Sequence, residues 1–293
     1  MTAPSATAAM PARDPVRVGI VSVHYDPRHL SRSAAAACRL ARESGAVAHV
    51  AVANDASIES GLRQAVAELS AARSDCVVHD NSGLEFGAYQ AGLGRLLPLD
   101  AFDWVVFVND TFGRHRAFPS VHRRHLLAAL ARPSVAGVPM AAGEVETHGR
   151  SWSILGKRSH RWLTTAVFAL DRAALRALGD RVHVPEVDAL VRATADPATF
   201  FAADLDPAIA DLIRGWILAP RSSETWYGAA PLDAANAARM AGKARAILQE
   251  KYLSAALDEA GTWFFDIKGA GTRDRVLRRL EAIGFALATR FRS

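Results

Sequence analysis

Two stretches of the chain place polar side chains beside apolar segments in a way that suits ligand chemistry. Residues 80–93 read Asp-Asn-Ser-Gly-Leu-Glu-Phe-Gly-Ala-Tyr-Gln-Ala-Gly-Leu, which predicts a polar turn and then a helix carrying small residues. Residues 104–111 read Trp-Val-Val-Phe-Val-Asn-Asp-Thr, which predicts a buried strand running into Asn109 and Asp110. Open α/β sheets bind ligands at the carboxyl ends of their strands. The two stretches therefore predict a nucleotide site with a metal-binding acid beside it.

Strands and helices alternate along the first half of the chain. Nearly continuous apolar runs predict buried strands at residues 16–23, 47–53, 76–79 and 104–108. Apolar residues at helical spacing predict helices between them, at residues 31–43, 58–69 and 86–97. This order predicts an α/β fold, with a right-handed, mostly parallel sheet covered by helices on both faces.

The second half of the chain is less regular. We expect helices at residues 119–131 and 172–178, strands at 134–138 and 164–170, and a long polar loop at 141–161. Residues 181–262 predict a mainly helical C-terminal portion, with breaks at Pro197, Pro207, Pro220 and Pro231.

Composition narrows the class of protein and its partners. The chain has 293 residues and a net charge of +5, and arginine supplies most of its cations, which favours phosphate or carboxylate partners. No basic-aromatic cluster of the RNA-binding type occurs, so we expect no nucleic-acid partner. Cys38 and Cys76 have no metal or redox spacing and predict small core residues in a reducing cytoplasm. No apolar run is long enough to cross a bilayer.

Several common α/β enzyme classes lack their signature here. Strand 16–23 runs into His-Tyr-Asp-Pro rather than Gly-x-Gly-x-x-Gly, which argues against a dinucleotide-dependent dehydrogenase. The sequence contains no Walker loop, no Gly-x-Ser-x-Gly elbow and no His-Glu-x-x-His helix.

The remaining motifs resemble a known family. Asn81, Gly83 and the run Glu-Phe-Gly-Ala-Tyr at 85–89, followed by Val-Asn-Asp-Thr at 108–111, resemble the nucleotide-sugar half of GT-A glycosyltransferases. More narrowly, they resemble the rhamnan synthesis protein F type. The strand at 164–170 and the segment Gln-Glu-Lys-Tyr-Leu-Ser-Ala-Ala-Leu at 249–257 resemble later motifs of that type. The resemblance covers residues 16–265 and implies a GT-A fold.

The resemblance implies a catalytic role for Asp110. A nucleoside diphosphate leaves readily only when its charge is neutralised, and a carboxylate-bound Mg²⁺ or Mn²⁺ does this. Asp110 would hold the cation, with Asn109 as a neutral neighbour. The two-carboxylate Asp-x-Asp pattern is missing here, which favours weak metal binding or an ion held mainly by phosphates. The alternative is a turn or cap acid after a strand.

The ends of the first strands would contact the donor. We expect Ser22, His24 and Tyr25 to face the nucleoside, with Tyr25 stacking on the base, and Asp55 to accept a hydrogen bond from base or ribose. The alternative for Asp55 is that it begins the next helix. Asn81, Gly83 and Gly87 would form the floor under the ribose and diphosphate, where small residues allow close approach. Turn formation and helix packing explain these three residues equally well.

An inverting transferase also needs a general base for the acceptor hydroxyl. By resemblance this is Glu250, and its rivals are Asp204, Asp206 and Glu224. The alternative for Glu250 is a solvated helical acid. Four loop cations would close over the diphosphate or form a solvated basic loop: Arg150, Lys157, Arg158 and Arg161. Three histidines invite a metal site, but neighbouring arginines disfavour it: His115, His122 and His125.

We therefore expect a flexible tail at 1–15, a GT-A-like domain at 16–268 and a basic amphipathic helix at 269–293. The expected function is transfer of a sugar from a nucleotide-sugar donor, dTDP-rhamnose among the candidates, to a glycan or lipid-linked acceptor in cell-envelope polysaccharide assembly. The expected location is the cytoplasm, or the inner face of the plasma membrane. Two alternatives are a non-catalytic nucleotide- or glycan-binding protein, and a basic scaffold on the membrane. The last helix either docks on the domain or rests on anionic lipid.

Overall fold

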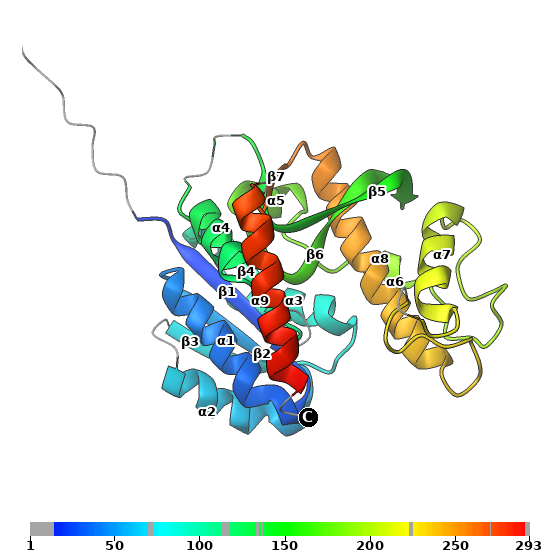
Figure 1. The fold of residues 1–293 in the computed structure, drawn as a ribbon, viewed down its shortest axis with the longest axis horizontal. Helices are drawn as coiled ribbons and strands as arrows, with labels where there is room; N and C mark the ends of the chain where they lie inside the picture. Colours follow the sequence, from blue (N-terminus) through cyan, green and yellow to red (C-terminus); the bar gives the residue numbers. More distant parts are fainter. Residues whose placement is uncertain are drawn as a thin grey trace, which may run out of the picture.

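A single seven-stranded sheet organises the chain in the computed structural model (Figure 1). The structure describes residues 15–69, 73–112, 118–132, 135, 137–222, 225–269 and 271–290, with backbone alone at 69 and 282–290. The strand order is β3-β2-β1-β4-β6-β5-β7. The strands are β1 (Val18–His24), β2 (Ala48–Ala53), β3 (Arg73–Val78), β4 (Trp104–Asn109), β5 (Met140–Ile154), β6 (Lys157–Asp171) and β7 (Trp263–Asp266). The predicted tail at 1–15 lies outside this range except for Pro15.

Four neighbouring strands are parallel, as predicted. β3, β2, β1 and β4 pair side by side in one direction, so that their carboxyl ends meet at one edge. β6 then runs antiparallel to β4, and β5 antiparallel to β6. The sheet is therefore mixed rather than wholly parallel.

Helices cover both faces of the sheet and bury its apolar side chains. One face packs against α1 (Leu30–Glu43), α2 (Glu59–Leu69) and α4 (Ser120–Leu130). The other packs against α3 (Leu84–Arg95), α5 (Arg172–Ala177) and α8 (Ala237–Glu259). Cys38 and Cys76 are both buried free thiols, in agreement with their predicted place in the core.

The predicted long loop at 141–161 is wrong, because these residues form most of a β-hairpin. β5 and β6 are each 15 residues long and pair out to Ile154 opposite Lys157. The two residues between them, Leu155 and Gly156, have φ of 48° and 77°, as a tight primed turn requires. Half-solvated strands carry many polar residues, which made this segment look like a loop. Of the strand expected at 134–138, residues 134 and 136 lie outside the described residues, and residues 135, 137 and 138 are not in a strand, since β5 begins at Met140.

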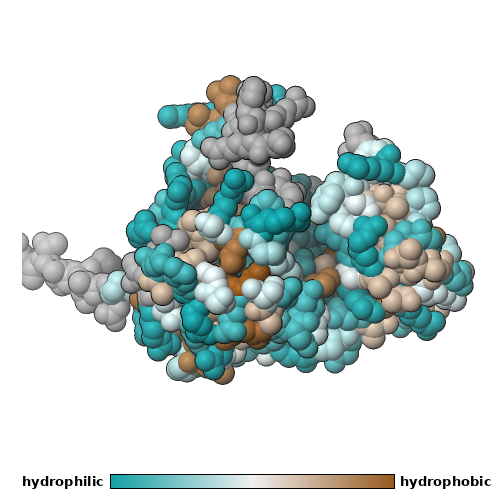
Figure 2. Space-filling view, turned by 90° about the horizontal axis from the view of Figure 1, so that it is seen from below, coloured by the Kyte–Doolittle hydropathy of each residue, from teal (hydrophilic) through white to brown (hydrophobic). Residues whose placement is uncertain are grey.

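The segment predicted to be mainly helical forms a lobe beside the sheet. It contains α6 (Pro185–Asp188), α7 (Pro207–Ile213), a π-helical turn at Arg214–Leu218 and the long α8. Irregular chain fills the intervals, so the segment is less helical than expected. Trp152 and Ile154 from the hairpin join Phe200, Ile209 and other buried residues of this lobe in a second core. Figure 2 shows a hollow between this lobe and the main body.

The final helix, α9 (Thr272–Arg290), follows β7 and lies beside α4. In Figure 1 it crosses the front of the molecule. Among the described residues, no helix is both long and apolar enough to cross a membrane.

Two glycines of α3 give a test of how closely this helix packs. A Cβ at Gly92 would overlap Val21 and Val52 of the sheet, whereas a Cβ at Gly94 would meet nothing within 4 Å. We expect Gly92→Ala to lower the free energy of unfolding by about 1–3 kcal/mol through overpacking. Gly94 lies two residues further along the same helix. Gly94→Ala should raise the free energy of unfolding by about 0.5–1 kcal/mol because glycine is a poor helix former. Urea unfolding of the two variants measures both changes, and equal shifts would contradict the packing.

Candidate functional site

The carboxyl end of β4 carries the predicted Asn109 and Asp110. Asn109 is 8% exposed, and its Oδ1 accepts hydrogen bonds from the backbone N–H of Thr111 at 3.1 Å and from its hydroxyl at 2.5 Å. These contacts fix the turn that follows the strand. The amide Nδ2 of Asn109 donates to the carbonyl of Thr165 at 3.5 Å. Asn109 therefore ties the end of β4 to the neighbouring strand β6.

Thr165 of β6 is the point where three elements meet. Its carbonyl accepts the Tyr89 hydroxyl of α3 at 2.9 Å as well as the amide of Asn109. Its backbone N–H and its hydroxyl both donate to Oε2 of Glu250 on α8, each at 3.0 Å. A residue that sequence reasoning placed only within a strand thus joins α3, β4 and α8.

Glu250 is held in place by these donors and by its own neighbour. Lys251 Nζ lies 3.2 Å from Glu250 Oε1 and 3.3 Å from the centre of the Trp162 ring. The Glu250 side chain keeps 20% of its surface exposed. A carboxylate offers about four lone-pair sites, so it retains capacity for one more donor. The structure thus brings Glu250 from α8 to the same edge as Asn109.

A cavity of about 500 Å³ opens at this edge, between β4, β6, α7 and α8. Its wall combines three acids, two lysines, two tryptophans, hydroxyls and an amide. The polar and aromatic lining residues are Glu85, Asn109, Thr111, Glu146, Trp162, Thr164, Thr165, Trp216, Lys243, Glu250 and Lys251. The hollow between the lobe and the main body is visible in Figure 2. Aromatic faces beside hydrogen-bonding groups of both kinds suit a polar ligand with apolar C–H faces.

Asp110 follows Asn109 of the cavity wall, near the buried Tyr89 and the partly buried Tyr25. It is 6% exposed, and its charge acts on both Tyr25 and Tyr89. Burial, followed by the charges of Glu85 and others including Asp110, raises the pKa of both phenols well above the usual value. Tyr25 is therefore a neutral aromatic group at the end of β1. That Tyr25 and Asp110 act on one ligand stays a prediction.

The donor set at this edge fits a cation that arrives with its ligand. Among the described residues, no three His, Cys, Asp or Glu side chains come together as a metal cage. One carboxylate with neutral oxygen donors beside it resembles the way Mg²⁺ is bound through one or two carboxylates plus substrate phosphates. Asp110 would be the carboxylate of such a site, with Asn109 beside it in the chain.

A polar network at the ends of β2 and β3 was missed by sequence reasoning. Asn54 is 3% exposed and donates to Asn81 Oδ1 at 2.6 Å, and its own Oδ1 lies 2.6 Å from His79 Nδ1. Asn81 has a φ of 64°, a left-handed conformation that asparagine tolerates. The sequence does carry a signal for this network, because Asn54 and Asp55 both follow a predicted strand. The sequence-based prediction, however, names only Asp55 as a binding residue.

The glycines of the 80–93 motif approach protein rather than open space. Gly83 has a φ of 65° and precedes α3, and a Cβ there would overlap the ring of His183. A Cβ at Gly87 would overlap the carbonyl of Ser82 in the preceding turn. These contacts favour the packing interpretation of Gly83 and Gly87 over a floor for ribose and diphosphate.

Ser22 and His24 lie inside the molecule rather than facing a nucleoside. They are 0% and 1% exposed and form a chain in which Ser22 Oγ lies 2.8 Å from His49 Nε2 and 3.0 Å from His24 Nε2. His24 Nδ1 lies 2.8 Å from the Ser33 hydroxyl of α1. This placement favours a structural role, in which the network satisfies buried polar groups under α1.

Asp55 and Arg158 lie away from the cavity. Asp55 is exposed and caps a short helical turn by accepting the Ser57 N–H at 2.8 Å, which lowers its pKa. The alternative of a helix-starting acid therefore accounts for Asp55.

Arg158 is an exposed residue near the tip of the β5–β6 hairpin, and its backbone N–H donates to Glu259. At about 3.4 Å per residue, it stands roughly 24 Å along β6 from Thr165.

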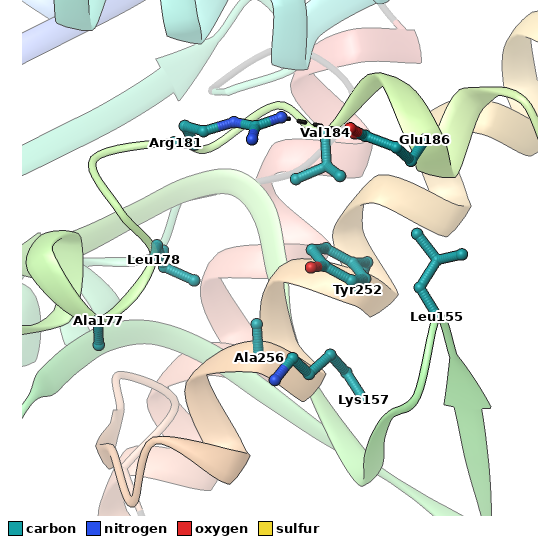
Figure 3. A pocket seen from close by; sticks show the side chains of 9 residues that line it. All are labelled: Leu155, Lys157, Ala177, Leu178, Arg181, Val184, Glu186, Tyr252 and Ala256. Carbon is teal, nitrogen blue, oxygen red and sulfur yellow. Dashed lines mark hydrogen bonds and ion pairs between the residues drawn. The ribbon is translucent and has the colours of Figure 1, made fainter.

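Two of the other predicted cations, on the hairpin, are paired with acids of α8. Lys157 contacts Glu259 at 2.9 Å, and Arg161 donates to Asp258. Lys157 also borders a separate pocket of about 300 Å³, shown in Figure 3, where Arg181 points towards Glu186 at 3.5 Å and Tyr252 projects from α8. Arg150 is exposed on β5. This arrangement favours a salt-bridged hairpin over a lid that closes on a diphosphate.

The rival acids and the histidines are distributed elsewhere. Asp206 caps α7 and accepts the Ser153 N–H at 2.7 Å, and Asp204 is exposed outside the cavity wall. Glu224 and His115 lie outside the described residues. His122 is buried 3.4 Å from Glu144, and His125 binds Asp274 of α9 at 2.9 Å. Of the three candidate base acids that the structure describes, Glu250 is the one in the cavity wall.

Comparison with known proteins does not assign this chain to a family. A scan against models of protein families finds no match, and a search of curated proteins finds no significant match. Function is therefore argued from the site itself.

The buried histidine chain predicts a pH dependence of stability. Burial lowers the pKa of His24 to about 3 and that of His49 to about 4. Both pKa values lie below the pKa of an unfolded histidine. The stabilisation of the fold by the two neutral histidines is therefore complete above pH 6.5 and is lost as the pH falls towards 4. We expect each histidine to lower the free energy of unfolding by about 2 kcal/mol between pH 7 and pH 5.

Urea unfolding at the two pH values tests this expectation. His49→Gln should remove about half of the pH dependence, because one of the two titrating groups is gone. The exposed His160, replaced by Gln, serves as the matched control and should leave the slope unchanged. Wild-type stability that is the same at pH 7 and pH 5 would contradict the burial argument.

Proposed function

We propose that this protein is a glycosyltransferase that moves a sugar from a nucleotide-sugar donor to a hydroxyl of a glycan or lipid-linked acceptor. The proposal rests on one observation above the others. Glu250 is oriented by Thr165 and Lys251 in the wall of a cavity that begins at Asn109, where parallel strands end. An acid, a cation-compatible turn and an aromatic-lined cavity at one strand edge are what sugar transfer requires.

Glu250 would act as the general base. In the transfer, an acceptor oxygen forms a bond to the anomeric carbon while the bond from that carbon to the diphosphate breaks. The proton of the acceptor hydroxyl passes to the carboxylate of Glu250 in an inverting reaction. The two Thr165 donors hold Oε2 and Lys251 holds Oε1, so the carboxylate does not need to reorient during the step.

The donor would lie between the β4 edge and the aromatic wall. Asp110 would hold a divalent cation shared with the diphosphate, and the cation would neutralise charge on the leaving group. Tyr25, at the end of β1, would contact the nucleoside. Trp162 and Trp216 offer flat faces to sugar rings, and Lys243 stands 5.6 Å from the centre of the Trp216 ring.

The resemblance of the 80–93 and 104–111 motifs to the rhamnan synthesis protein F type supports a role in cell-envelope polysaccharide assembly. The mixed α/β sheet with helices on both faces agrees with a GT-A-like domain. A second candidate function is a domain that binds nucleotide or glycan without transferring a sugar. The low number of acids at the turn after β4 favours it. A measurement of sugar transfer separates the two candidates.

Donor binding is tested by thermal unfolding with UDP, GDP, dTDP and their sugar forms, with and without Mn²⁺. A nucleotide present at 100 times its dissociation constant should raise Tm by about 5 °C. The rise should require Mn²⁺ and be lost in Asp110→Asn, which keeps the shape but removes the charge. Asp55→Asn is the matched control and should respond like wild type. No rise with any nucleotide would overturn the proposed function.

The role of Glu250 is tested by release of nucleoside diphosphate in the presence of acceptor. Glu250→Gln should lower kcat by about 10²–10⁴, the usual contribution of a general base, while the nucleotide-induced rise in Tm persists. Thr165→Val removes one donor to Glu250 and should give a smaller loss. Glu259→Gln, on the same helix but paired with Lys157, should leave kcat unchanged. Full activity of Glu250→Gln would remove this residue as the base.

A further inference from the structure

The helix α9 is held on the molecule by its acidic side chains. Asp274 contacts Arg124 at 2.7 Å and His125 at 2.9 Å, both on α4. Glu281, about two turns further along, accepts the backbone N–H of Ser120 at 2.6 Å and also its hydroxyl. These two residues are the only acids of the sequence after residue 271. Both acids of the helix are therefore engaged on its inner side.

Two apolar residues of α9 lie on the opposite side of the helix from these acids, whereas Leu277 lies on the acids' side and is partly buried. At about 100° per residue, Val276 and Leu280 stand roughly 200° and 240° around the axis from Asp274. They are 51% and 60% exposed, among the most exposed large apolar side chains described. The sequence continues this spacing with Ile283 and Leu287. The helix therefore packs on α4 through its acids, while Val276 and Leu280 are exposed.

Arginines flank the exposed apolar residues. Arg273, Arg275 and Arg279 are exposed, and the sequence adds Arg290 and Arg292 beyond them. Because the acids face α4, the outward side of the helix combines apolar and cationic groups without a negative charge among its described residues. The whole chain carries a net charge of +5, which adds to the same field.

We propose that α9 binds the surface of a membrane rich in anionic lipids, with Val276 and Leu280 entering the boundary between head groups and acyl chains. Apolar residues flanked by arginines are typical of helices that lie in this boundary. The arginines would then contact lipid phosphates at the surface. A second copy of the chain is a poorer occupant, since pairing two such faces would bring like charges together. This inference does not depend on sugar transfer.

The test is co-sedimentation of the full chain with vesicles of phosphatidylcholine alone or with 30% phosphatidylglycerol, at about 0.1 M salt. Wild type should bind only the anionic vesicles. Arg275→Gln with Arg279→Gln should weaken binding about 30-fold, as expected for two charges at the surface. Val276→Ser with Leu280→Ser should weaken it about tenfold or more, because less apolar surface enters the lipid.

Two double variants elsewhere on the surface are the matched controls. Val47→Ser with Val78→Ser removes two similarly exposed apolar side chains, and Arg73→Gln with Arg192→Gln removes two exposed charges. Both should bind like wild type, and all variants should keep the wild-type Tm. Equal binding to both kinds of vesicle, binding to neither, or equal losses in the controls would overturn the proposal. A dimer that Val276→Ser with Leu280→Ser converts to monomer, without lipid binding, would assign the face to self-association instead.

Discussion

The hydrogen bonds of Thr165 are the interaction on which the site depends. Its carbonyl receives Tyr89 and Asn109, and its N–H and hydroxyl hold Glu250. The antiparallel pairing of β6 with β4 makes this geometry possible, because Val167 lies opposite Val108 and brings Thr165 past the end of β4. Hydrogen bonds to a charged group contribute about 1.5–3 kcal/mol each. The same contacts therefore stabilise the fold and orient the carboxylate.

This arrangement places the two halves of the chain around one cavity. The parallel strand β4 supplies Asn109, while α8 and the hairpin supply Glu250, Lys251 and Trp162. The lobe has its own buried core, so the cavity wall is supported from both sides. In the proposed reaction, the parallel half would hold the donor and the lobe would present the acceptor. Positioning two substrates on rigid elements is a large part of what such a reaction needs.

Polar contacts also decide how the last helix is oriented. Asp274 and Glu281 bind α4, so the amphipathic pattern of α9 points outward instead of into the core. An amphipathic sequence indicates that one face of a helix avoids water. It does not indicate which surface covers that face. In this molecule the contacts of Asp274 and Glu281 with α4 determine which side of α9 faces inward.

The sequence by itself determined the α/β order, the first four parallel strands, their covering helices and the strand edge that carries Asn109 and Asp110. Buried parallel strands and amphipathic helices leave local patterns of period two or 3.6, or continuous apolar runs, which can be recognised without long-range information. The role of Glu250 as a base, which the family resemblance implies, stays a prediction. Only the tertiary structure decided that 141–161 is a hairpin, that Gly83 and Gly87 approach His183 and Ser82, and that Thr165 joins three elements. These features depend on contacts between residues far apart in the chain, and such contacts leave no local pattern.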